Sequence, residues 1–275
     1  MTISKSNVPR PEAPRWLMPT LVGVLLILVA AISFFVGRAT APTTAAPAPA
    51  PATTAPAGQA TAEEQPPAEE ENTPPQKAAP IEDAKTRELA MSLPRRQEGD
   101  PLALGPVDAP VVFSMWEDFA CPMCTRFELD SFDQIRKYAE EGKIRIEWND
   151  LSIFASNYHS DLGARGARAA ARQGKFWEFV RAAYHSAGEG NHPTYDDGIV
   201  MNIAKEAGVP DLEKFKTDYN DPKIAEAVKA DSDKAMQMGI TGTPAFIVND
   251  AFISGAYPTP YFINTIEDRL KAAKK

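Results

Sequence analysis

The only two cysteines of the 275-residue chain lie three positions apart, in the sequence Cys121-Pro122-Met123-Cys124. An apolar, β-branched run from Pro110 to Trp116 predicts a buried strand before them. A cysteine at the start of the helix that follows is stabilised as a thiolate by unpaired backbone N–H groups and the helix dipole. The pKa of such a thiol falls from about 8.5 to between about 3.5 and 7.5. The pair can therefore alternate between dithiol and disulfide, with the more enclosed Cys124 placed to attack a mixed disulfide at Cys121.

Two other uses of a cysteine pair are a stabilising disulfide and a zinc site. A disulfide between positions three apart closes a very small loop and removes little entropy from the unfolded chain. A zinc site would need His159, His185 or His192 to complete its ligands, but none of these has a paired metal spacing. The pattern favours redox chemistry, and we expect the three histidines to be ordinary surface or core residues with no metal bound.

The elements around the cysteines predict an α/β domain. Apolar residues after Cys124 recur at helical spacing and predict an amphipathic helix that ends near Gly142. The stretch from Lys143 to Trp148 alternates between polar and apolar residues and predicts a second strand. Helices are then expected over Asp161–Gln173 and Phe176–Ala187, and at about 195–207, 211–219 and 223–237.

The last part of the chain returns to strand patterns. Two short apolar runs, Ala245–Val248 and Ala251–Ile253, are separated by Asn249-Asp250 and predict a hairpin. Thr259 is then expected to be the N-cap of a final helix that has Pro260 in its first turn and runs to about residue 273.

Two motifs far apart in the sequence resemble those of the DsbA-like thiol–disulfide oxidoreductases of the thioredoxin superfamily. The first is the segment 119–124, Phe-Ala-Cys-Pro-Met-Cys, after a strand, and the second is the segment 242–246, Gly-Thr-Pro-Ala-Phe, before the late hairpin. A less specific third motif, Lys-Phe-Trp-Glu-Phe, covers residues 175–179. The resemblance spans most of residues 100–275. It implies a thioredoxin-like fold with an inserted helical domain.

The resemblance also implies roles for single residues. Cys121 would be the attacking cysteine and Cys124 the resolving one, with Pro122 and Met123 as the active-site dipeptide between them. Pro244 would be the cis-proline that faces the redox pair. The backbone of Thr243 would then pair with an extended substrate strand, which is recognition by β-addition. The partners implied are reduced or unfolded exported proteins, together with a membrane reoxidant resembling DsbB or vitamin K epoxide reductase.

The chain departs from the family pattern beside the cysteines. Many members have histidine where this chain has Met123, which donates no comparable hydrogen bond to a thiolate. Met115 stands six positions before Cys121, where thioredoxins carry an acid. The acids Glu117 and Asp118 are nearer, and we expect them to be solvated loop charges. We therefore expect the pKa of Cys121 to be lowered less than in the strongest oxidants of the family.

The N-terminal part of the chain predicts a membrane anchor. No charged residue occurs from Trp16 to Gly37, and a helix of that length would span about 33 Å, enough to cross the hydrocarbon core. Basic residues predominate before this segment, so residues 1–15 are expected in the cytoplasm and the remainder outside. The alternative is a cleaved signal peptide, since Ala39-Thr40-Ala41 resembles a cleavage site, although the apolar core of a signal peptide runs only about 7–15 residues.

Residues 38–80 predict a disordered stalk. They hold a large share of the chain's 25 prolines and no aromatic residue, leucine, isoleucine or valine, so they cannot bury enough apolar surface to fold. The globular domain is expected over residues 81–275, with the helical insertion at about 152–237. The formal net charge of −8 excludes an ordinary nucleic-acid binder, which would present a basic face.

The function predicted from these patterns is that of a thiol–disulfide oxidoreductase that introduces disulfides into exported proteins. The protein would be anchored in the cell membrane by residues 16–37, with its catalytic domain outside, and would need no cofactor. A disulfide isomerase or a reductase with the same site remains an alternative. A non-enzymatic adaptor that holds exported peptides on a thioredoxin scaffold is another, because fold alone does not fix function.

Overall fold

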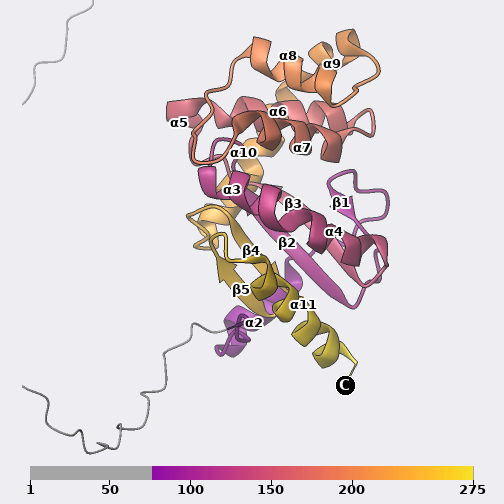
Figure 1. Cartoon of the computed structure of the whole chain (residues 1–275), viewed down its shortest axis with the longest axis vertical. Helices are drawn as coiled ribbons and strands as arrows, with labels where there is room; N and C mark the ends of the chain where they lie inside the picture. The colour runs from indigo at the N-terminus through magenta and orange to yellow at the C-terminus, as the bar shows by residue number, and fades with distance from the viewer. Residues whose placement is uncertain (1–75, 275) are drawn as a thin grey trace, which may run out of the picture. The chain divides into compact units, whose positions relative to one another are not determined.

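Five strands form one mixed sheet in the order β1-β3-β2-β4-β5 in the computed structural model, which describes residues 76–274 (Figure 1). The strands are β1 (Ala103–Leu104), β2 (Val111–Glu117), β3 (Ile144–Asp150), β4 (Ala245–Val248) and β5 (Ala251–Ser254). Strands β2 and β3 are parallel, and the other three pairs are antiparallel. The chain therefore crosses from β2 to β3 through the helical segment that begins at the cysteines.

Helices cover both faces of the sheet and extend beyond one end of it (Figure 1). They are α2 (Ala84–Ser92), α3 (Pro122–Phe127), the π-helical turn η1 (Glu128–Phe132), α4 (Asp133–Glu140), α5 (Ala155–Tyr158), α6 (Ser160–Ala171), α7 (Phe176–Ala187), α8 (Asp197–Glu206), α9 (Leu212–Tyr219), α10 (Pro222–Gln237) and α11 (Thr259–Ala273). The segment α3–η1–α4 packs on one face together with α11, where Phe127 contacts Phe246 and Phe262. On the other face α2 buries Ala90 against β2 and β4.

The elements predicted around the cysteines and in the hairpin are confirmed. Strands β2, β3, β4 and β5 and helices α6 to α10 lie where the patterns placed them, and Asn249 adopts the positive φ of 52° that a tight hairpin turn requires. The helix after the cysteines is interrupted by η1. The predicted N-cap of the last helix is wrong: Pro258 holds that position, and the Thr259 hydroxyl donates instead to the carbonyl of Asp130 at 3.0 Å.

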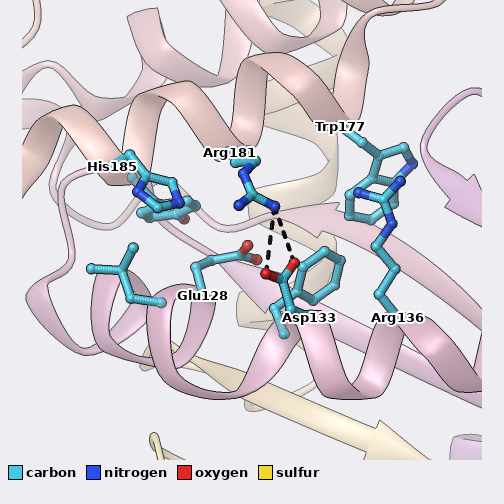
Figure 2. Close-up of a pocket in the computed structure, with 9 residues that line it drawn as sticks. Glu128, Asp133, Arg136, Trp177, Arg181 and His185 are labelled. Atoms are coloured by element: carbon cyan, nitrogen blue, oxygen red, sulfur yellow. Dashed lines mark hydrogen bonds and ion pairs between the residues drawn. The ribbon is translucent and has the colours of Figure 1, made fainter.

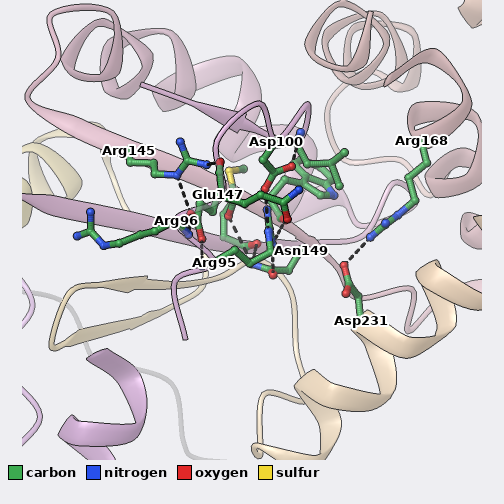
Figure 3. A network of polar contacts seen from close by, with 12 residues as sticks. Arg95, Arg96, Asp100, Arg145, Glu147, Asn149, Arg168 and Asp231 are labelled. Atoms are coloured by element: carbon green, nitrogen blue, oxygen red, sulfur yellow. Dashed lines mark hydrogen bonds and ion pairs between the residues drawn. The ribbon is translucent and has the colours of Figure 1, made fainter. Parts of the chain in front are cut away.

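Strand β3 is buried on both faces, although its residues alternate between polar and apolar. The segment between α2 and β1 covers that face and is held there by the carboxylate of Glu147 (Figure 3). This carboxylate accepts hydrogen bonds from the backbone N–H groups of Arg95 (2.7 Å) and Arg96 (2.8 Å) and from Nε of Arg145 (2.7 Å). Arg145 in turn donates to the carbonyl of Gln97 at 2.8 Å. The buried ion pair is thus fully bonded, as burial of two charges requires.

Residues before 81, where the composition predicted that the domain begins, already pack against it. Ala78 is buried, and its N–H donates to the Thr265 hydroxyl at 2.9 Å. Pro80 forms an isolated bridge with Ala251 at the edge of the sheet. The predicted anchor at 16–37, and most of the predicted stalk, lie outside the described residues. Within residues 76–274, no helix combines the length and the apolar character needed to cross a membrane.

We expect Glu147→Ala to lower the free energy of unfolding by about 3–5 kcal/mol, because it leaves the buried Arg145 guanidinium unpaired and frees two backbone N–H groups. Chemical denaturation measures the loss. The matched control is Glu140→Ala, which removes the exposed pair between Arg136 and Glu140 on α4 and should cost less than about 1 kcal/mol. Equal losses in the two variants would contradict the anchoring role of Glu147.

Candidate active site

The junction between β2 and α3 places the two cysteines one helical turn apart. Cys121 is the N-cap of α3, in an extended backbone conformation, and Pro122 occupies the first helical position, where its missing N–H costs nothing. Cys121 is 4% exposed and Cys124 is fully buried, so the second cysteine is the more enclosed, as predicted. Met123 lies between them, 40% exposed at the surface. Both thiols are free, so the structure holds the reduced form of the pair.

The loop before β4 brings Thr243 and Pro244 to the cysteines. The peptide bond between Thr243 and Pro244 is cis, which confirms the prediction made from the family resemblance. Sγ of Cys121 lies 3.3 Å from the carbonyl oxygen of Thr243, to which the thiol donates. The two predicted motifs therefore meet in one site, although they are far apart in the sequence. All six predicted site residues lie at this junction or directly beside it.

The two thiols differ in proton affinity: the pKa of one is lowered and the pKa of the other is raised. Interaction with the Cys124 thiol lowers the pKa of Cys121 to about 6 against the effect of burial, with further help from the Thr243 side chain and the backbone N–H groups of Cys124 and Met123. Burial raises the pKa of Cys124 well above its usual range, and the proximity of Cys121 and Glu117 raises it further. At neutral pH the charge therefore resides on Cys121 and the proton on Cys124. This is the division of roles that an attacking and a resolving cysteine need.

Asp118 connects the cysteine loop to the helical insertion. Its Oδ1 accepts from the N–H of Ala120 at 2.7 Å, and its Oδ2 accepts from the N–H of Phe154 (2.9 Å) and the hydroxyl of Ser160 (3.0 Å). Its backbone N–H donates to Sγ of Cys124 at 3.5 Å. Burial raises the pKa of Asp118 to about 6, against the effect of these hydrogen bonds. The prediction that this residue is a solvated loop charge is wrong, because the helical insertion covers it.

Glu117 is also buried, and the prediction of a solvated charge is wrong for it too. Both oxygens of its carboxyl group lack a hydrogen-bond partner in the described part of the chain. Burial raises the pKa of Glu117 well above its usual range, the charge of Glu128 raises it further, and interaction with the Cys124 thiol opposes both. An acid next to the resolving thiol can exchange a proton with it.

The position of Glu117 could have been inferred from strand periodicity. Successive side chains of a strand point to opposite faces, so Glu117 projects from the same face of β2 as Met115, where thioredoxins carry their acid. Both residues lie on the face that packs against α3. The burial itself was not part of that pattern, and it is burial that raises the pKa of the Glu117 carboxyl group.

The histidines considered as zinc ligands do not gather at the cysteines. Among residues 76–274 no group of three or more His, Cys, Asp or Glu side chains is arranged to hold a metal ion. Only His192 approaches the site: its Nδ1 lies 2.7 Å from the carbonyl oxygen of Ala120, and its ring stacks on Tyr158. This contact again joins the helical insertion to the cysteine loop.

Comparisons with known proteins agree with this geometry. A family model described as thioredoxin matches residues 97–268. The chain is 31% identical to the probable disulfide bond formation protein D of Bacillus anthracis over 152 residues, which cover 54% of this chain and 69% of that protein. Oxidised BdbD of Bacillus subtilis is similar in structure, with a TM-score of 0.56, 27% identity and coverage of 63% of this chain and 94% of that one. Wolbachia pipientis α-DsbA1 shares the fold, with a TM-score of 0.57, 23% identity and coverage of 69% and 98%.

We expect the ultraviolet absorbance of the thiolate in the reduced protein to rise with a midpoint near pH 6, the pKa of Cys121. This pKa lies below the ordinary value of 9.0, so the thiolate stabilises the folded reduced protein. That stability is fully present above pH 9 and is lost as the pH falls through 6. The stability advantage of the reduced protein over Cys121→Ala should shrink accordingly.

The oxidised protein is the control for this titration, because it has no thiol and should show no absorbance step. Asp118 also titrates near pH 6, but its carboxyl group does not contribute to this absorbance. A midpoint near 9 would show that the Cys124 thiol, the Thr243 side chain and the helix start do not stabilise the thiolate.

Proposed function

Since the chain belongs to the thioredoxin family, in its DsbA-like branch of thiol–disulfide oxidoreductases, we propose that it introduces disulfides into exported proteins through Cys121 and Cys124. The observation that carries this proposal is the unequal proton affinity of the two sulfurs at the end of β2. Cys121 holds a thiolate beside the surface loop of Thr243, and Cys124 holds a proton in the interior.

The reaction transfers two electrons from the substrate to the protein. A substrate thiolate attacks Sγ of Cys121 in the Cys121–Cys124 disulfide, and the sulfur of Cys124 leaves with the electron pair and takes up a proton. A mixed disulfide then joins the substrate to Cys121. A second substrate thiolate attacks the substrate sulfur of this bond and releases Cys121 as a thiolate. The substrate leaves with a disulfide, and the protein remains as the dithiol.

The pKa of Cys121 favours this direction. A thiol with a low pKa is a good leaving group, and a stabilised thiolate lowers the free energy of the reduced form. At neutral pH a thiol with a pKa of about 6 is mostly ionised, while an ordinary thiol is mostly protonated. The reduced protein is therefore stabilised relative to its disulfide, which makes the disulfide an oxidant.

The cis-proline loop supports recognition of an extended substrate segment. The Thr243 carbonyl lies beside Sγ of Cys121, and Pro244 is buried behind it as β4 begins. An unfolded chain that pairs with the backbone of Thr243 brings its cysteine next to the reactive sulfur. Because backbone groups make this contact, it accepts many sequences, as a protein that acts on diverse unfolded chains requires.

The same proposal includes the membrane. An anchor at residues 16–37, followed by a stalk at 38–80, would hold the domain at the outer surface of the cell membrane, with residues 1–15 in the cytoplasm. Reoxidation of the dithiol needs an electron acceptor, for which a membrane partner resembling DsbB or vitamin K epoxide reductase is proposed. The charge pattern around residues 16–37 and the need for that partner support this placement.

We expect Cys121→Ala to abolish oxidation of a reduced model protein, because no other sulfur reaches the substrate. Cys124→Ala should accumulate covalent complexes when Cys121 attacks a substrate that already holds a disulfide, since the thiol that would displace that substrate is absent. Non-reducing electrophoresis of substrate mixtures detects these complexes. Met91→Ala, at an exposed position of α2, is the matched control and should leave both results unchanged. Undiminished oxidation by Cys121→Ala would overturn the proposal, and a Cys124→Ala protein without complexes would favour a peptide-binding adaptor.

The reduction potential of the Cys121–Cys124 pair separates oxidase from reductase. With a pKa between those of the attacking cysteines of DsbA and thioredoxin, about 3.5 and 7, we expect a potential between about −120 and −270 mV. Equilibration with glutathione redox buffers measures it. A value at or below about −270 mV would assign the protein to the reductases instead.

A further inference from the structure

The attack on the Cys121–Cys124 disulfide requires a substrate thiolate. An ordinary cysteine thiol of an unfolded chain is ionised only to a few per cent at neutral pH. Cys121 needs no such help, because with a pKa of about 6 it leaves the mixed disulfide as a thiolate. The proton that limits the exchange is therefore the one on the incoming thiol. A basic group beside Cys121 that removes this proton increases the concentration of the attacking species.

His192 is the histidine of the described residues whose side chain contacts the cysteine loop. Its Nδ1 lies 2.7 Å from the carbonyl oxygen of Ala120, the residue directly before Cys121. A carbonyl oxygen only accepts hydrogen bonds, so Nδ1 carries the hydrogen and donates it. In the neutral ring the other nitrogen, Nε2, is then an acceptor with a free lone pair. The contact with Ala120 thus fixes the tautomer in which Nε2 can take up a proton.

Two aromatic side chains of the helical insertion hold this imidazole ring. The ring stacks on Tyr158, with 4.6 Å between the ring centroids, and meets Phe154 edge-on with a centroid distance of 4.8 Å. His192 itself is exposed, and within residues 76–274 its Nε2 has no hydrogen-bond partner. The ring therefore has the arrangement of a catalytic base, with one nitrogen held by an orienting group and the other open to an incoming group.

The cysteine loop is attached to the same insertion as the ring. Three successive carbonyls before Cys121, those of Asp118, Phe119 and Ala120, accept hydrogen bonds from Tyr184 (3.2 Å), Tyr195 (3.1 Å) and His192 (2.7 Å). At Gly163 in α6 a Cβ would lie 2.9 Å from the Cβ of Phe119, so the insertion approaches the loop as closely as backbone allows. The imidazole and Cys121 thereby belong to one framework, which keeps their relative position during the reaction.

The charges around the ring favour proton uptake. The titratable groups on the elements packed against it are Tyr158 and His159 at the end of α5, Glu189 in its own loop, Tyr195 after that loop, and Asp118 and Cys121 in the cysteine loop. Asp118 is bound to the same residue as the ring, because its carboxyl group accepts from the N–H of Ala120 at 2.7 Å. With a pKa of about 6, Asp118 is mostly ionised at neutral pH, and its negative charge stabilises an imidazolium nearby.

We propose that His192 is the general base that removes the proton from the attacking thiol of the substrate. This inference rests on the disulfide-forming function proposed above. Nε2 accepts the proton of the first substrate thiol, and the thiolate attacks Sγ of Cys121 while the sulfur of Cys124 leaves with the electron pair and takes up a proton.

The imidazolium of His192 then gives its proton to solvent. Nε2 next accepts the proton of the second substrate thiol, whose sulfur attacks the substrate sulfur of the mixed disulfide and releases Cys121 as a thiolate. Two electrons pass from the substrate sulfurs to the cysteine pair, and the two substrate protons pass to solvent by way of His192.

Single-turnover kinetics of the oxidised protein with an excess of a reduced two-cysteine peptide measure the first attack, with acid quenching to follow the loss of the Cys121–Cys124 disulfide. His192→Ala should slow this attack about tenfold at pH 7, within the ceiling of about thirtyfold set by the ionised fraction of a thiol with a pKa of about 8.5. The deficit should shrink as the pH rises through the pKa of the peptide thiol, because the thiol then ionises without help.

A second peptide separates proton removal from positioning of the loop. In it selenocysteine replaces both cysteines, and its selenols are already ionised at neutral pH and need no base. His192→Ala should react with this peptide at the rate of the unaltered protein. His192→Gln, whose amide can still donate to the Ala120 carbonyl, should show the same contrast: slow with the thiol peptide and unchanged with the selenol peptide.

His185→Ala is the matched control. This exposed histidine of α7 lines a pocket with Arg181 and Glu128 (Figure 2), and its loss should leave the rates with both peptides unchanged. Full rates with the thiol peptide in both His192 variants would overturn the proposal. Equal slowing with the thiol and selenol peptides would also overturn it, because His192 would then only position the loop.

These outcomes are distinct from failure of the disulfide-forming function. The peptides report on the Cys121–Cys124 disulfide itself, so the contrast between thiol and selenol is measured whether or not the protein oxidises exported chains. Conversely, oxidation of a reduced model protein that persists while His192→Ala reacts at full rate would remove the general base and leave the function standing.

Discussion

The free-energy cost of placing charge in an apolar interior decides which of the two sulfurs carries the proton. Cys124 is enclosed by the aromatic core beneath the sheet end, so its thiolate is unfavourable there. Cys121, one turn earlier, caps the helix at the edge of that core and meets backbone N–H groups and the Thr243 loop. The proposed direction of electron flow and the proposed choice of attacking sulfur both depend on this asymmetry.

Much of this could be predicted from the sequence because it is local. The cysteine spacing, the proline at the first helical position and the hairpin turn at Asn249 act within a few residues, and each lies where its pattern placed it. The burial of Asp118 is not local, because Ser160 and Tyr184 of the insertion contact it from positions well along the chain. The polar face of β3 is covered by the segment between α2 and β1, which is not part of the strand's own pattern, so its burial could not be inferred from the strand alone.

Two sets of buried ionisable groups in the domain differ in their hydrogen bonding. The pair of Arg145 and Glu147 is fully bonded, and it fixes a connecting segment. Glu117 and Glu128 have carboxyl oxygens without partners in the described residues, and they lie on the side of the sheet where Cys124 is buried. Buried polar groups are normally paired, so unpaired ones beside a reactive sulfur indicate a use other than stability. The contrast between the bonded pair of Arg145 and Glu147 and these carboxyl oxygens strengthens the interpretation that Glu117 and Glu128 do not serve stability.

The hydrogen bonds of Asp118 have a consequence for engineering and for divergence among relatives. One carboxylate holds Ala120 of the cysteine loop, Phe154 before α5 and Ser160 at the start of α6. The helical insertion is therefore not a detachable module. A chimera that exchanges the insertion with that of a relative must keep a backbone N–H at position 154 and a hydroxyl at position 160, because the buried carboxyl group of Asp118 otherwise loses partners.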